Sequence, residues 1–342
     1  MAQHYSEICA RYLRLAVILC LGGAASCLAQ TCRAASPSDI YQATVPIADR
    51  SEAAQTAAFQ AALKIVLVRA TGRRSADEDP ALAPLVTNAR RYVQQYRAAA
   101  DKQQWVAFDG PAIERWLAQN GQPVWGHERP STFVWLTVTT GPQSGTVVTS
   151  ADVSEMKRVI DAAAAARGIE LVWPSAADLQ KNQLDYASLN TTSPTTLGEI
   201  GRRSGGDGML IGRASGAGPA ASVHWTFLFQ DHSSDVSGVP EGVNHAADTY
   251  AGLFSASGGI VPVDVEVTGI GDLRDYAYVE AYLESLTFIS HVGVLSLSGD
   301  SARFHLTMRG GAESLQRALA LHGRFQPIAA GDNGIQRFQL RR

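Results

Sequence analysis

The chain has 342 residues, of which 46% are hydrophobic and 18% charged. This composition is typical of a globular protein of two to three domains, and it excludes a disordered chain or a multi-span membrane protein. Lys and Arg number 29 against 32 Asp and Glu, a net charge of -3, and no lysine-rich block occurs. We therefore expect no nucleic-acid partner, because such partners are bound by neutralising phosphates.

Residues 1–29 have the pattern of a secretory signal peptide. Arg11 and Arg14 precede a short apolar run at 15–21, and small residues lead to an expected cleavage after Ala29, with Ala34 as the alternative. The apolar run is much shorter than the roughly 20 residues that span a bilayer. We expect a periplasmic protein without a transmembrane span after cleavage, and an uncleaved membrane anchor is the other interpretation.

The cysteines give a second indication of export. All four lie within the first 32 positions, at Cys9, Cys20, Cys27 and Cys32. The body of the chain is then expected to contain no disulfide framework, no Cys-ligated zinc and no thiol nucleophile, which suits an oxidising compartment. Residues 24–27 also resemble a lipoprotein cleavage box, so lipid attachment at Cys27 is an alternative to release into the periplasm.

The first segment after the leader, residues 37–130, is predicted to be an α+β domain. Phe59, Leu63, Val66 and Ala70 recur at steps of three and four, which predicts one buried helix face. Asp49 or Ser51 can cap this helix, and Thr71-Gly72 ends it. The expected elements are a strand at 41–47, this helix, a helix at 84–99, a strand at 105–108 and a helix at 111–119.

The second segment, residues 131–258, is predicted to be an α/β domain. Residues 133–138 form a nearly continuous apolar run, as expected of a strand covered on both faces. Alternation of strands and helices favours a layered unit. By fold-level analogy it resembles the amino-terminal domain of TolB-like proteins. The expected elements are strands at 133–138, 169–172, 209–211 and 223–229, with helices at 151–167 (capped by Ser150), 194–203 and 243–256.

The third segment, residues 259–342, has the clearest pattern. Val263, Val265 and Val267 alternate with acidic residues, so one strand face is buried. A helix at 276–286, strands at 289–297 and 303–308, a helix at 312–321 and a strand at 325–328 follow. The last strand can pair with residues 336–340. This β-α-β-β-α-β order is that of a ferredoxin-like unit. We thus predict an α+β or α/β protein of three small layered units.

Several residue blocks resemble a known bacterial family. They are Ala62-Leu63 through Arg69 with Thr71-Gly72, Pro123-Val124-Trp125-Gly126 with Arg129-Pro130 and 133–136, Ala166-Arg167-Gly168-Ile169, and 208–213. Together they resemble the exported proteobacterial family known as domain of unknown function 2066. The resemblance spans nearly the whole mature chain and implies an envelope location. It implies no established activity and therefore supplies no catalytic residues.

Catalytic and cofactor motifs were sought in the body of the chain. Ser154 and Lys157 match a Ser-x-x-Lys spacing, but no Lys-Thr-Gly or Ser-Asp-Asn element accompanies it, so a capped helical turn is the favoured interpretation. The glycine-rich run at 201–208 leaves a helix and enters a strand, the reverse of a phosphate-binding loop. No histidines pair at i, i+4. We expect no catalytic residue, metal or cofactor from sequence motifs.

The strongest candidate binding residues are Trp125, His127 and Arg129, with Trp135 downstream. Tryptophan and arginine are typical anchors at protein interfaces, and tryptophan also stacks on sugar rings. The alternative is structural: Trp125 is buried and Arg129 bridges two domains, while Trp135 belongs to the core.

Three functions follow as hypotheses. The favoured one is a non-enzymatic periplasmic assembly or interaction module, whose partner is an envelope protein or peptidoglycan. The second is an envelope hydrolase in which dispersed groups such as Asp207, His224 and Asp231 converge in a cleft. The third is a glycan-binding protein that uses exposed tryptophans, Trp125 above all.

Overall fold

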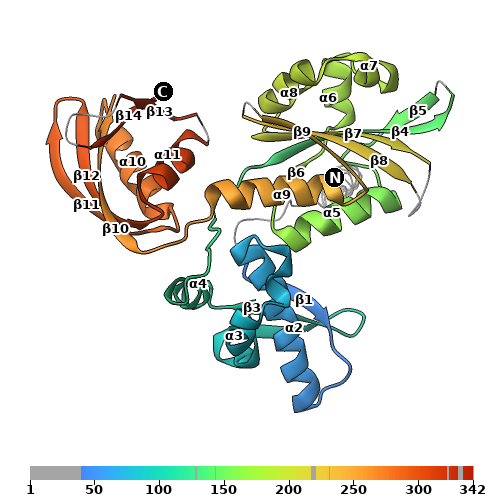
Figure 1. The fold of residues 1–342 in the computed structure, drawn as a ribbon. Helices are drawn as coiled ribbons and strands as arrows, with labels where there is room; N and C mark the ends of the chain where they lie inside the picture. Colours follow the sequence, from blue (N-terminus) through green and yellow to red (C-terminus); the bar gives the residue numbers. More distant parts are fainter. Residues whose placement is uncertain are drawn as a thin grey trace, which may run out of the picture. The chain divides into compact units, whose positions relative to one another are not determined.

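The computed structural model describes residues 40–127, 129–142, 144–216, 221–230, 232–321, 323–329 and 334–341. The signal peptide predicted at residues 1–29, its cleavage positions and Cys27 lie outside the described residues. Helices accompany antiparallel and mixed sheets along the chain, which confirms the α+β class (Figure 1). In the part described, no helix has both the length and the apolar character that a bilayer crossing requires.

The first segment is an antiparallel sheet of order β1-β3-β2 with a long helix packed on it. Phe59, Leu63, Val66 and Ala70 of that helix are buried, which confirms the predicted stripe. The Ser51 hydroxyl caps its start. The elements are β1 (Gln42–Pro46), α2 (Glu52–Thr71), η2 (Arg74–Asp77), η3 (Pro80–Leu82), α3 (Ala83–Thr87), η4 (Ala89–Tyr92), β2 (Val93–Ala99), β3 (Gln103–Phe108) and α4 (Gly110–Gln119).

The helix predicted at residues 84–99 is wrong. Helix α3 stops at Thr87, a single 3-10 turn follows, and residues 93–99 form strand β2. Gln, Ala and Arg in this stretch favour a helix in isolation. However, β3 offers a free edge, and β2 pairs with it from Val93 opposite Phe108 to Ala99 opposite Gln103. Tertiary pairing therefore outweighs local helix propensity here.

The second segment is a six-stranded sheet of order β5-β4-β7-β8-β9, with β6 paired to β4. Helices α5 and α9 cover one face, and α7 and α8 the other. Strand β4 is consequently buried over its first six residues, as its apolar run predicted. The elements are β4 (Thr132–Gly141), β5 (Ser144–Val147), α5 (Glu155–Arg167), β6 (Leu171–Val172), α6 (Ala176–Lys181), α7 (Tyr186–Thr191), α8 (Pro194–Arg203), β7 (Gly208–Ser215), β8 (Ser222–Phe229), β9 (His232–Ser237) and α9 (Glu241–Phe254).

Helix α5 begins one turn later than predicted, because Ser154 and not Ser150 is its N-cap. The Ser154 hydroxyl accepts a hydrogen bond from the backbone N–H of Lys157 at 3.4 Å. The Lys157 ammonium pairs with Asp161, 2.7 Å away and one turn further along the helix. The Ser-x-x-Lys spacing is therefore that of a capped helical turn. The ammonium of Lys157 pairs with the Asp161 carboxylate and not with the Ser154 hydroxyl.

The third segment is a five-stranded sheet of order β11-β12-β10-β14-β13. The predicted β-α-β-β-α-β order is present from β10 to β13, and β14 lies between β10 and β13, parallel to β10. That this segment has a ferredoxin-like fold stays a prediction. The elements are β10 (Ile260–Thr268), α10 (Leu273–Ser285), β11 (Ile289–Ser298), β12 (Ser301–Arg309), α11 (Gly311–Ala320), β13 (Phe325–Ile328) and β14 (Gln336–Leu340).

Both helices of this segment pack on one face of its sheet (Figure 1). The other face carries a row of charged side chains across β12, β10 and β14. Glu266 lies at its centre, 3.5 Å from Arg303 and 2.7 Å from Arg337, and its side chain is only 9% exposed. The hydrogen bond from Arg337 is the main cause that lowers the pKa of Glu266 below its ordinary value of 4.5.

We expect Glu266→Gln to destabilise the protein at neutral pH only. A lowered pKa in the folded state adds stability above the unfolded value, and that stability is lost as the pH falls through the folded pKa. The expected loss at pH 7 is about 1 kcal/mol, because both arginines are substantially solvated. Urea unfolding at pH 7 and pH 3 measures it, with the exposed Glu313→Gln as control. An equal loss at both values would contradict the electrostatic explanation.

Candidate functional site at the segment junction

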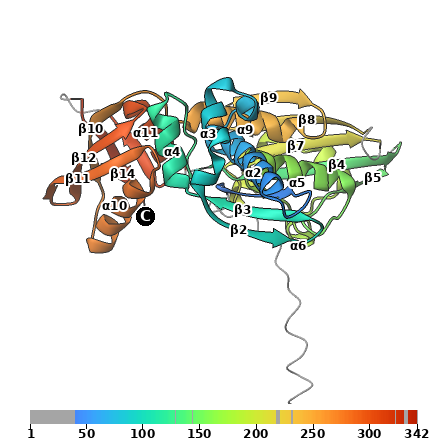
Figure 2. The same ribbon diagram turned by 90° about the horizontal axis from the view of Figure 1, so that it is seen from below.

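Two helices from different segments end beside each other. Helix α2 ends at Thr71, helix α5 ends at Arg167, and Gly72 and Gly168 follow them with left-handed backbones of φ 71° and 67°. The two helices are in contact (Figure 2). Each carboxyl-terminal turn presents carbonyls that have no partner in their own helix, together with the negative end of the helix dipole. Two such ends repel each other unless cationic donors lie between them.

Arg129 supplies those donors from the loop between α4 and β4. Its guanidinium donates to the carbonyls of Arg69 at 2.7 Å, Arg167 at 3.2 Å and Gly168 at 3.0 Å. It also donates to Gly126 and Trp125 within its own loop, both at 2.9 Å. The five N–H groups of an arginine in their fixed plane suit this arrangement. Arg129 therefore joins the ends of both helices to the loop that connects the segments.

Arg167 completes the junction from the opposite side. Its side chain is 3% exposed and donates to the Gly72 carbonyl at 2.7 Å and to the Asp248 carboxylate of α9 at 2.6 Å. Arg74 pairs with the same aspartate at 3.4 Å and with Glu241 at 3.0 Å. The carboxyl ends of α2 and α5 and the middle of α9 are thus held by one network of charge-assisted hydrogen bonds.

Trp125 is part of this junction rather than a binding ledge. Its ring is fully buried, with the Arg129 guanidinium 3.9 Å above it, and its backbone N–H donates to the Ala70 carbonyl at 2.7 Å. The structural alternative, a buried Trp125 with Arg129 bridging two segments, describes this geometry. Sugar stacking needs an exposed ring face, and neither Trp125 nor Trp135 provides one.

His127 lies on the other side of the loop, exposed, in a second cluster of polar groups. Its ring packs edge-on against Tyr41 with 5.9 Å between centroids. The Tyr41 hydroxyl donates to the Glu114 carboxylate of α4. The backbone N–H of His127 donates to the Thr287 hydroxyl at 3.2 Å, which connects the loop to the third segment. The predicted triplet therefore divides: Trp125 and Arg129 hold the junction, and His127 contacts Tyr41 and Thr287 on the other side of the loop.

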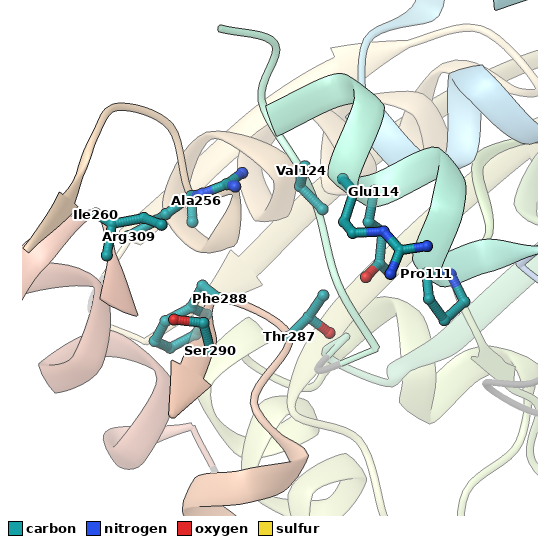
Figure 3. A pocket seen from close by; sticks show the side chains of 10 residues that line it. Pro111, Glu114, Val124, Ala256, Ile260, Thr287, Phe288, Ser290 and Arg309 are labelled. Carbon is teal, nitrogen blue, oxygen red and sulfur yellow. The ribbon is translucent and has the colours of Figure 1, made fainter. Parts of the chain in front are cut away.

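A pocket of about 210 Å³ lies between α4 and the third segment (Figure 3). Two of its lining residues, Val124 and Ala256, form an isolated β-bridge. The Val124 N–H donates to the Ala256 carbonyl at 3.1 Å, and the Ala256 N–H donates to the Val124 carbonyl at 2.9 Å. Figure 3 shows residues of α4 on one side and residues of the third segment on the other. The lining residues are Pro111, Glu114, Arg115, Val124, Ala256, Ile260, Thr287, Phe288, Ser290 and Arg309.

Glu114 and Tyr41 form the titratable part of this site. Burial raises the pKa of Glu114 above 4.5, and the hydrogen bond from Tyr41 and the charges of His127, Arg129 and Arg309 oppose that rise. Burial and the nearby Glu114 carboxylate also raise the pKa of Tyr41 well above its usual value. The site thus keeps one desolvated carboxyl group beside several cations.

The dispersed hydrolase site is not assembled among the residues described. Asp207 accepts hydrogen bonds from the backbone and hydroxyl of Ser131, both at 2.9 Å, and precedes Gly208, which pairs with Phe229. His224 pairs with Arg213, five residues further along β7, or about 17 Å. Asp231 lies outside the described residues. Asp207 and His224 therefore do not converge, and the candidate set loses its geometric basis.

The side chains that could bind a metal ion are dispersed in the described part of the chain. Within the described ranges, no three or more His, Cys, Asp or Glu side chains gather in a way that could hold a metal ion. His305 instead pairs with Asp264 at 2.7 Å, and the His224 ring lies 3.7 Å from Asp235. Each of these pairs lies exposed on the surface of a sheet.

Comparison with known proteins identifies one family match. Residues 34–126 match a family described as a domain of unknown function, DUF8605, which is well under half of the chain. No curated protein matches the chain, and no solved structure does. The match supports a protein with an uncharacterised domain, but it gives no support to the DUF2066 resemblance. It includes Trp125 and ends before Arg129.

Sequence reasoning missed most of the groups that form the two clusters. Arg167 lay within a block that was noted only for its resemblance, and its position before an αL glycine was a usable signal for a helix-end contact. Glu114, Tyr41 and Arg309 come from an amphipathic helix, the turn before β1 and the end of β12, which are far apart in the sequence. No spacing rule connects such positions, so only the fold reveals that they meet.

We expect Arg129→Met to destabilise the protein by about 3 kcal/mol, because several helix-end carbonyls would lose their charged donor. Arg129→Lys keeps the charge but offers fewer donors in a different geometry, so about half of that loss is expected. Urea unfolding measures both, with the exposed Arg158→Met on α5 as control. If Arg129→Met unfolded at the same urea concentration as the parent, the junction would not be held as described.

A second prediction concerns the pH dependence of Glu114. Since its folded pKa is raised, the folded state binds the proton more tightly, and stability declines as the pH rises from 4.5 through the folded pKa. Glu114→Gln retains an acceptor for Tyr41 but removes the buried charge. The variant should therefore gain stability over the parent at pH 8 and lose that advantage near pH 4.5. Unfolding at both values, with the exposed Glu284→Gln as control, decides between this and a pH-independent effect.

Proposed function

We propose that this protein is exported to the periplasm and acts there as a non-enzymatic interaction module that binds an extended segment of another envelope protein. The leader at residues 1–29 supports export, with cleavage after Ala29 and lipid attachment at Cys27 as the alternative. The envelope role also agrees with the resemblance to DUF2066. The strongest support for binding is a single surface feature, the outer edge of β11.

Strand β11 is an edge strand with ten residues. Three apolar side chains within four residues are exposed: Val294 at 43%, Leu295 at 57% and Leu297 at 62%. A register shift between Val294 and Ser296 leaves Leu295 outside the pairing with β12. An edge strand carries unpaired backbone donors and acceptors, and apolar side chains beside them add affinity for a further strand. This edge can therefore accept an extended segment.

Most other sheet edges of the described part carry features that oppose further pairing. Strand β1 ends in Pro46 and β13 contains Pro327, and proline cannot donate to a further strand. Strand β5 has four residues, β9 carries Asp235 among serines, and β2 carries Arg97 and one exposed aromatic side chain, Tyr96. Short, charged or proline-containing edges are the usual devices against unwanted pairing. Because these edges carry such devices, the apolar edge of β11 stands out as a binding surface.

We expect Leu295→Lys to weaken partner binding about tenfold, because one apolar side chain is lost from the contact. The experiment places the photo-crosslinker p-benzoylphenylalanine at position 295 of the full chain in living cells and identifies the adduct. The identified protein is then purified and its affinity for the parent and variants is measured. Leu273→Lys is the matched control, since Leu273 is 79% exposed on α10 in the same segment.

Three results would contradict the proposal. Equal losses from Leu295→Lys and Leu273→Lys would remove β11 as the binding edge. A full-length chain that fractionates with the cytosol, leader intact, would remove export. Turnover of an envelope substrate by the purified chain, abolished by one pocket substitution, would favour the hydrolase alternative.

A further inference from the structure

The pocket beside α4 has the size and walls of a site for one side-chain-sized group. Its volume is about 210 Å³. Pockets for drug-sized ligands are larger, from about 300 Å³ upward. Most of its wall is apolar, from Pro111, Val124, Ala256, Ile260 and Phe288. Such a pocket suits a phenyl ring or a branched aliphatic chain.

Two arginines that border this pocket have no hydrogen-bonded partner among the described residues. Among the described residues, neither Arg115 of α4 nor Arg309 of β12 forms a hydrogen bond or an ion pair through its guanidinium. Three arginines elsewhere in the fold have close partners: Arg129 and Arg167 bind backbone carbonyls, and Arg337 binds Glu266. Arg309 is also half-buried, and the charge of Glu114 is the acidic group that interacts with it, without a hydrogen bond between them. An anion that hydrogen-bonds to the guanidinium would compensate more of the lost hydration.

The view in Figure 3 shows how Arg309 is placed. Its side chain extends from the third segment toward the side of Val124 and α4, and Glu114 lies on that side. The Glu114 carboxyl is held by Tyr41, so it stays at the wall of the pocket. Two arginines against one glutamate leave a positive charge that a single anionic group would balance.

We propose that this pocket binds a small amphiphilic carboxylate, with its apolar body against Phe288 and Ile260 and its carboxylate on the Arg309 guanidinium. A planar carboxylate accepts two parallel hydrogen bonds from an arginine fork. A doubly charged phosphate is disfavoured, because the Glu114 carboxylate and the apolar walls oppose a second negative charge. The Tyr41 hydroxyl donates to Oε1 of Glu114. Among the described residues no donor contacts Oε2, so this oxygen can accept a hydrogen bond from an N–H or O–H group of the ligand.

This chemistry has two sources. One is a free carboxylic acid with an aromatic or branched aliphatic body. The other is the last residue of a peptide, which brings an apolar side chain, a free carboxylate and a backbone N–H that can donate to Glu114. The inference does not depend on the β11 edge, because Leu295 and Leu297 do not line the pocket.

Isothermal titration of the purified full-length chain tests the proposal. The probes are 3-phenylpropanoate, its amide, N-acetyl-Ala-Phe with a free carboxylate, and inorganic phosphate. The acid is expected to bind at least about tenfold more tightly than its amide, which corresponds to one charge-assisted contact. Tighter binding of N-acetyl-Ala-Phe than of 3-phenylpropanoate would identify a peptide end as the source, and the reverse a free acid.

Variants locate the binding. Arg309→Gln should lower the affinity for the acid at least about tenfold and leave the weak affinity for the amide unchanged, while Arg309→Lys should restore part of the loss. Arg50→Gln, which removes an exposed arginine outside the pocket, is the matched control. Thermal unfolding verifies that each variant is folded.

Three outcomes overturn the proposal. They are equal affinity for acid and amide, tighter binding of phosphate than of any carboxylate, and an Arg309→Gln variant that is folded and binds the acid as the parent does. Absence of measurable heat with all four probes at millimolar concentration also overturns it. None of these outcomes alters the result of the Leu295 crosslinking experiment, so the two proposals fail independently.

Discussion

The convergence of two helix carboxyl ends is the constraint on which the arrangement of the segments depends. Helices α2 and α5 meet with the same sign of dipole and with backbone carbonyls that need donors. Arg129 and Arg167 supply both positive charge and hydrogen bonds, and each of them reaches a carbonyl of the other segment's helix end. Without these two side chains, the same contact would be repulsive and its polar groups unsatisfied.

The pocket is a consequence of that junction. Once Arg129 and the buried Trp125 hold the loop after α4, the neighbouring residues have little freedom. A Cβ at Gly126 would lie 2.2 Å from the Thr287 hydroxyl, so only glycine permits the close approach of the third segment. His127 is thereby placed against Tyr41, and the charge of Arg309 acts on Glu114 of α4. Trp125 and Arg129 thus position the loop that carries His127 and the pocket-lining Val124.

Elements with a strong internal pattern could be predicted from the sequence, and those that depend on a distant partner could not. The stripe on α2 and the apolar run of β4 follow from local periodicity and survive folding. Strand β2 has no such pattern, since its state is decided by β3. The same division holds for the site. Trp125 and Arg129 share one short motif, whereas Glu114, Tyr41 and Arg309 become neighbours only when three separate elements pack together.

Arginines with different roles in this protein cannot be distinguished by residue type or spacing, but their partners distinguish them. Arg129, Arg167 and Arg337 have carbonyl or carboxylate partners at 2.7 Å or less, so their charge is used within the fold. Arg309 is half-buried beside apolar walls and has no such partner among the described residues. A guanidinium that loses hydration without gaining hydrogen bonds costs folding free energy, and such a cost is best explained where a bound anion recovers it. The combination of this guanidinium with an apolar pocket therefore supports the pocket, and not the more conspicuous Trp125, as the proposed site for a small ligand.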